Sequence, residues 1–92
     1  MRIIGYIKHP VLKITVFQMD NRLSVKLETG LYEQTYKFRQ GGMINTLEDV
    51  KKIITEEFTQ AVLDQVEEMH QIKNTALKRM HSEKEDSFDD II

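Results

Sequence analysis

Residues 46–80, TLEDVKKIITEEFTQAVLDQVEEMHQIKNTALKRM, decide the fold of this 92-residue chain. At 100° per residue, most of their apolar side chains fall within about 60° of one line, which is the pattern of an amphipathic helix. This stripe contains Leu47, Val50, Ile54, Phe58, Ala61, Val62, Met69, Ile72, Ala76 and Met80, and Gln65 interrupts it. The stretch predicts one long helix, or two helices separated by a short break.

The residues at the start of this stretch suit the first turn of a helix. The Thr46 hydroxyl can accept a hydrogen bond from the backbone of Asp49, and Asn45 is the alternative cap. Glu48 and Asp49 then lie in the first turn, where the helix dipole favours negative charge. We expect the helix to begin at Thr46 or directly after it.

The predicted helix is longer than the sheet it would cover. Thirty-five helical residues span about 52 Å, whereas an eight-residue strand spans about 27 Å. About half of the helix must therefore fold back or leave the sheet. We expect a break near Asn74, because Asn74 and Thr75 have poor helix propensity.

The first 39 residues predict strands. Residues 11–19 are rich in β-branched and aromatic side chains, and residues 22–29 alternate with Leu23, Val25 and Leu27 on one side. Residues 31–39 alternate again, and residues 3–7, which Pro10 separates from the next strand, are a candidate fourth strand. The fold class is therefore α+β: a three- or four-stranded antiparallel meander followed by one long C-terminal helix on one face.

Residues 1–81 are expected to form a single domain. Residues 82–92, SEKEDSFDDII, are acidic and have little periodicity, which favours a disordered tail. The first half of the chain is basic and the second half is acidic. Residues 1–42 carry seven Lys or Arg against three Asp or Glu, and residues 43–92 carry six against twelve.

The composition excludes several classes of protein. The chain has no cysteine, so it has neither disulfides nor thiolate metal ligands, and this favours a reducing compartment. It also lacks an apolar run near the ~20 residues of a membrane span and a signal-peptide pattern at its start. We expect a cytoplasmic protein without membrane contact.

Only weak motifs suggest chemistry. Glu67 and His70 have the Glu-x-x-His spacing of carboxylate-bridged metal sites, but a site of that kind needs more ligands than the pair provides. The helix carboxylates read as a solvated face, and no serine has a neighbouring base. We therefore expect no catalytic residues, no metal and no cofactor.

One face of the predicted sheet is basic. Its candidate binding residues are Lys13, Phe17, Lys26, Lys37 and Arg39. Sheets that carry basic and aromatic residues bind single-stranded nucleic acids. However, Glu28 and Glu33 share the face and the sequence pI is about 5.9, whereas a basic domain is the usual footprint of such proteins.

A second, weaker stripe runs along the helix. Leu63, Val66, His70 and Leu77 lie roughly 100–160° from the Leu47 line. A helix that is apolar on two sides is usually packed on two sides. This stripe packs on a second copy, which makes these four residues a dimer interface, or it covers a corner of the same sheet or packs on the N-terminal strand. The sequence thus predicts a small non-catalytic interaction module, a homodimer that binds a protein or peptide, with nucleic-acid binding by the basic face as the alternative.

Overall fold

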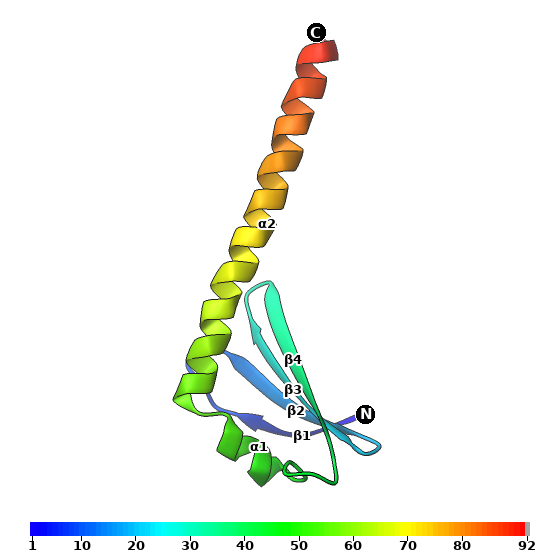
Figure 1. Ribbon diagram of the computed structural model, residues 1–92, viewed down its shortest axis with the longest axis vertical. Helices are drawn as coiled ribbons and strands as arrows, with labels where there is room; N and C mark the ends of the chain where they lie inside the picture. Colours follow the sequence, from blue (N-terminus) through cyan, green and yellow to red (C-terminus); the bar gives the residue numbers. More distant parts are fainter. Residues whose placement is uncertain (92) are drawn as a thin grey trace.

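A computed structural model describes the backbone of residues 1–91 and the side chains of residues 1–81. Four strands are followed by two helices (Figure 1): β1 (Arg2–Ile7), β2 (Lys13–Met19), β3 (Arg22–Thr29), β4 (Tyr32–Arg39), α1 (Leu47–Ile53) and α2 (Glu56–Ile91). The strands form one antiparallel sheet in the order β1-β2-β3-β4. The predicted α+β meander is confirmed, and residues 2–7 are its fourth strand.

The alternation of the sequence separates the two faces of the sheet. Residues 12–27 supply six of the eight buried apolar side chains, namely Leu12, Ile14, Val16, Leu23, Val25 and Leu27. Val50 from α1 and Val62 from α2 complete this core. Both helices therefore pack on the same face, which we call the inner face. The opposite side is the outer face.

Two tight turns set the register of the meander. Asp20 and Gly30 both have positive φ, 53° and 57°, and they follow β2 and β3 directly. Asp tolerates this region better than most side chains, and Gly adopts it without strain. β2 pairs with β3 from Lys13–Glu28 to Met19–Arg22 without interruption. Asp20 and Asn21 thus form the hairpin turn between β2 and β3.

The helix begins as expected but breaks elsewhere. Thr46 caps α1 in a capping box: its hydroxyl accepts from the Asp49 backbone, and the Asp49 carboxylate accepts from the Thr46 backbone. Asn45 instead bonds to the backbone of Gly41 and Gly42.

The predicted break near Asn74 is wrong, because α2 is continuous there. The chain breaks at residues 54–55, where the Thr55 hydroxyl accepts from the Phe58 backbone and starts the new helix. Asn74 does not cap a helix end. Its side chain bonds to His70 one turn earlier, so the helix continues past it.

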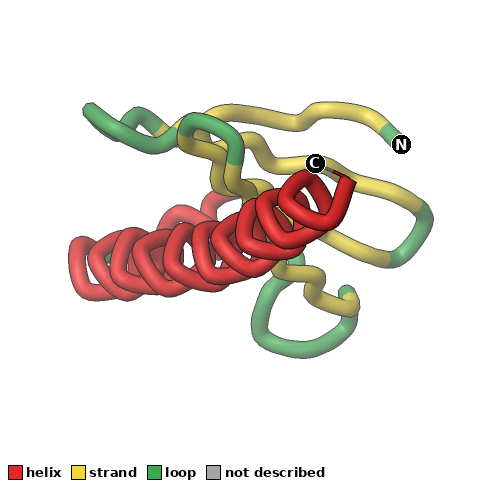
Figure 2. The backbone as a smooth tube through the Cα atoms, turned by 90° about the horizontal axis from the view of Figure 1, so that it is seen from above, coloured by secondary structure: helices red, strands yellow, loops and turns green. Residues whose placement is uncertain are grey.

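α2 lies across β4 and then extends past the sheet (Figure 1). The Gln34 side-chain amide donates to the Val62 carbonyl over 2.9 Å, and the rings of Tyr36 and Phe58 meet edge-on at 5.3 Å. Viewed from above, the helix crosses the strands of the twisted sheet (Figure 2). The molecule is therefore elongated, 62 × 27 × 19 Å. The prediction of a disordered tail concerns residues 82–92, whose side chains lie outside the described part.

Candidate functional site

The outer face brings the five predicted binding residues together. Lys13 alternates with Leu12 and Ile14, so it points away from the core. Across the strands, Phe17 is opposite Ser24, and Ser24 is opposite Lys37. The complete predicted set on this face is Lys13, Phe17, Lys26, Lys37 and Arg39. The sheet thus gathers residues that are up to 26 positions apart onto one surface.

Lys26 is held at the centre of this face. Its Nζ lies 3.5 Å from a carboxylate oxygen of Glu28 and 3.7 Å from one of Glu33. It also lies 5.7 Å from the centroid of the Phe17 ring, within the range of a cation–π contact. Lys26 is therefore partly neutralised and orders its neighbours, while Lys13, Lys37 and Arg39 stay exposed.

Sequence reasoning missed two apolar residues of this face. Ile3 is opposite Phe17, and Tyr6 is opposite Thr15. The side chains of Ile3 and Tyr6 are 49% and 59% exposed. A bulge between Ile3 and Gly5 shifts the alternation of β1 by one residue. Because a bulge has no fixed sequence signature, the facing of β1 could not be read from its letters.

Thr15 shows how closely the outer face is packed at its middle. It is only 3% exposed although it points away from the helices. It pairs with Tyr6 on one side and Lys26 on the other, and these longer side chains cover it. The outer face thus has a packed centre, with exposed Ile3 and Met19 towards one end.

The predicted dimer residues are divided between two environments. Leu63 packs against the hydrophobic core, and Val66 is half-buried. His70 contacts Tyr32 of the same chain, with Nδ1 2.8 Å from the hydroxyl and the two rings edge-on at 5.8 Å. Leu77 is exposed. Leu63 and His70 therefore face their own sheet, as the alternative interpretation of this stripe expected.

His70 has both ring nitrogens engaged. Nδ1 contacts Tyr32, and Nε2 lies 3.1 Å from the side-chain nitrogen of Asn74. Lys73 places its Nζ 5.3 Å from the centroid of the Tyr32 ring on the same side. Among residues 1–81, no three His, Asp or Glu side chains gather closely enough to hold a metal ion. Of the Glu67-x-x-His70 pair, His70 contacts the sheet and Glu67 is exposed.

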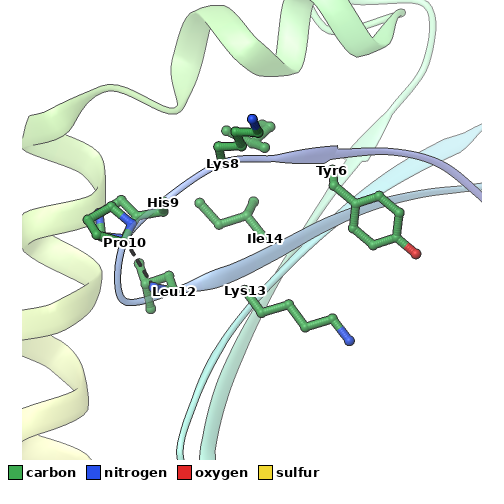
Figure 3. A pocket seen from close by; sticks show the side chains of 8 residues that line it. Tyr6, Lys8, His9, Pro10, Leu12, Lys13 and Ile14 are labelled. Carbon is green, nitrogen blue, oxygen red and sulfur yellow. Dashed lines mark hydrogen bonds between the residues drawn. The ribbon is translucent and has the colours of Figure 1, made fainter.

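The loop between β1 and β2 encloses an open hollow of about 470 Å³ (Figure 3). His9 holds this loop together, because its Nδ1 accepts hydrogen bonds from the backbone N–H groups of Val11 and Leu12 at 3.1 and 3.0 Å. Pro10, which lies between His9 and Val11, has no backbone N–H and therefore needs no acceptor. Because Nδ1 is occupied in this way, His9 holds the loop in shape and is a poor candidate for a base.

The comparisons with known proteins do not assign the chain to a family. No family model matches it, and neither a curated protein nor a solved structure matches it. Within the part of the chain that the structure describes, no helix has the length and apolar character needed to cross a membrane.

Proposed function

We propose that the protein is a small, non-catalytic, cytoplasmic interaction module, and that the outer face of its sheet binds a protein or peptide partner. One observation carries this proposal: the outer face exposes Ile3, Tyr6 and Met19 beside a row of cations. Exposed apolar side chains that cluster within a polar rim are typical of protein interaction sites. Both helices pack on the inner face, so none of their described residues covers this surface.

The charges of the outer face define the partner. It carries five cationic residues, Lys13, Arg22, Lys26, Lys37 and Arg39, against the two acids Glu28 and Glu33. Those two acids already contact Lys26, which leaves the other four cations to a ligand. The fitting partner is therefore a segment that combines apolar anchors with Asp or Glu, because complementary charge steers association and fixes orientation.

Strand addition is a weaker mode of binding here. β1 and β4 are the two edges of the sheet, and an extended peptide could pair with either. The bulge in β1 breaks the regular spacing of its backbone donors and acceptors. Because bulges protect edge strands from pairing, β1 is a poor template for an added strand.

The interface between helix and sheet supports a structural role. A catalytic pocket at this interface would need polar side chains, and Gln34 of β4 and Gln65 of α2 are the candidates. Gln34 instead donates to the Val62 carbonyl and accepts from the Tyr36 hydroxyl, and Gln65 is exposed. Gln34 is thus bonded within the interface while Gln65 faces solvent, and we assign a packing role to this interface.

Binding of single-stranded nucleic acid is the second candidate, and the position of Tyr6 favours it. Tyr6 and Phe17 give the basic face two aromatic side chains on which bases could stack. The carboxylate that contacts Lys26 and the acidic sequence pI of about 5.9 weigh against nucleic-acid binding. Fluorescence anisotropy with a labelled oligouridine tests it: binding that weakens steeply with salt and is lost in a Lys13→Glu/Lys37→Glu variant would replace the protein partner by RNA.

The proposed function is tested by selecting peptides from a random display library on the wild-type chain. Binders to a Tyr6→Ser/Met19→Ser variant are first removed. We expect enriched peptides that contain acidic and large apolar residues, and whose affinity falls at least tenfold on the double variant. Met43→Ser, in an exposed loop away from the sheet face, is the control and should bind normally. Failure to enrich any sequence, or equal affinity for the double variant, would overturn the proposal.

A further inference from the structure

The second half of α2 extends beyond the sheet. Its 36 residues span about 54 Å, twice the length of an eight-residue strand. Tyr32, at the start of β4, contacts the helix at His70 and Lys73. From residue 72 to residue 81, every side chain except half-buried Asn74 is exposed. Lys73, at the start of this portion, still contacts the Tyr32 ring of β4. Residues 69–81, which comprise this portion and the turn that contacts Tyr32, are called the extended segment of α2.

The extended segment carries an apolar stripe that is exposed from Ile72 onward. At 100° per residue, Met69, Ile72, Ala76 and Met80 fall within an arc of about 80°. Ile72 is 68% exposed and Met80 is 54% exposed. This spacing of three, four and four residues is the pattern of a helix that packs against another helix. A single exposed Ile would need no explanation, but a row over three turns predicts a partner.

Charge along residues 56–81 of α2 is arranged in two blocks. Residues 56–68 contain five acids and no base, whereas residues 69–81 contain Lys73, Lys78 and Arg79 and no acid. The boundary between the blocks lies just before Ile72. Two copies of α2 side by side in antiparallel orientation, crossing at Ile72, place residues 63–68 of each copy, with three acids, beside residues 76–81 of the other, with two bases. Parallel copies would place like charges together.

We propose that the apolar stripe of α2 is covered by a second copy of this chain, with the two helices antiparallel and crossing at Ile72. In this arrangement Ile72 meets Ile72 at the two-fold axis, and Met69 meets Ala76 of the other copy. Such an interface is self-complementary, as a two-fold dimer requires. The two sheets lie at opposite ends, so both outer faces stay accessible. The dimer does not depend on which partner the outer face binds.

Engineered cysteines test the geometry, since the chain has none of its own. In the antiparallel dimer, Ile72→Cys places two thiols at the axis, and mild oxidation should link the chains nearly completely. Met80→Cys places its two thiols about 24 Å apart, eight residues from the axis in each direction. A disulfide needs Cα atoms within about 7 Å, so this variant should stay unlinked. Linking of both variants, or of neither, would contradict the proposal.

Light scattering tests the interface without a covalent bond. The wild type should have twice the chain mass of 10.9 kDa, and Ile72→Glu should be monomeric. Met43→Glu adds the same charge at an exposed apolar residue in the loop before α1 and should remain dimeric. Because Ile72 is exposed, we expect its substitution to leave the fold intact, and circular dichroism checks this. A monomeric wild type at millimolar concentration would overturn the proposal.

The charge blocks are tested by reversal. Lys78→Glu/Arg79→Glu should weaken the dimer at least tenfold, because it places acids beside the acidic block of the other copy. Adding Glu67→Lys/Glu68→Lys should restore association by reversing the second block as well. If the variant with all four substitutions dimerises no better than Lys78→Glu/Arg79→Glu alone, the antiparallel orientation is wrong.

Discussion

The Tyr32 hydroxyl lies 2.8 Å from Nδ1 of His70 and joins the start of β4 to the middle of α2. Together with Lys73, which also reaches the Tyr32 ring, this contact fixes the helix near the end of the sheet. It also directs the imidazole of His70 towards the sheet of the same chain.

Tyr32→Phe keeps the ring and removes only the hydroxyl. We expect it to lower the free energy of unfolding by about 0.5–1.5 kcal/mol, the range for a single net hydrogen bond. The exposure of this pair places the expected value near the lower end. Urea denaturation measures it, and Tyr6→Phe, at an exposed tyrosine of the outer face, is the matched control. Equal losses in the two variants would show that the Tyr32–His70 contact contributes nothing specific.

Gly5 allows α1 to approach β1. A Cβ at position 5 would lie 2.6 Å from Cδ2 of Leu47, closer than van der Waals contact allows. Gly5→Ala should therefore destabilise the fold by about 1–3 kcal/mol through overpacking. Gly42→Ala is the control, because a Cβ there meets nothing within 4 Å. Thermal denaturation of Gly5→Ala/Leu47→Ala should show a loss smaller than the sum of the single losses; strict additivity would place the clash elsewhere.

Leu27 is central to the core, at 1% exposed. Leu27→Ala should cost about 2–5 kcal/mol, which approaches the whole stability of a small domain. Leu31→Ala makes the same chemical change in the β3–β4 turn, where the side chain is 83% exposed, and should change stability by less than about 0.5 kcal/mol. Guanidinium denaturation distinguishes them. Similar midpoints would mean that Leu27 is not buried in solution.

Asp49 makes the stability of α1 dependent on pH. Hydrogen bonding from the Asn45 backbone, aided by Thr46 and the charge of Lys52, holds the pKa of the Asp49 carboxyl below its ordinary value of 3.8, against a smaller opposing effect of desolvation. Because the folded pKa is the lower one, this contribution is present in full above the unfolded pKa. It is lost as the pH falls through the folded pKa.

Asp49→Asn should therefore be less stable than the wild type at about pH 7, and the difference should shrink below about pH 4. Denaturant titrations across this range measure it. Glu48→Gln removes a charge from the same turn but leaves the capping box intact, so it should lose less stability at neutral pH. A difference for Asp49→Asn that stays constant into acid would refute the assignment.

The fold could be predicted where one physical rule dominated. Alternation placed Leu23, Val25 and Leu27 on the inner face, and the chemistry of Thr46 and Asp49 located the start of α1. The helix break could not be placed in this way. Asn74 has a residue type common at helix ends, but its side chain contacts His70 within the helix. The cap at the break is Thr55, whose hydroxyl accepts from the Phe58 backbone.

The candidate site could be predicted in part. Lys13, Phe17, Lys26, Lys37 and Arg39 reach the outer face because regular strands alternate. Ile3 and Tyr6 were missed because the bulge in β1 resets the alternation, and their exposure depends on pairing with residues of β2 that lie 14 and 9 positions later in the sequence. Likewise, nothing in the letters around His70 indicates that it would contact Tyr32, 38 positions earlier.

The central claim is that the outer face of the sheet binds the partner, and methyl NMR of a selected peptide bound to the labelled chain tests it most directly. Ile3 and Met19 report on the outer face, while Ile72 and Met80 report on the extended segment of α2. We predict that titration of the peptide shifts the methyl signals of Ile3 and Met19 and leaves those of Ile72 and Met80 in place. Shifts confined to Ile72 and Met80 would contradict the account, because they would place the partner on the helix.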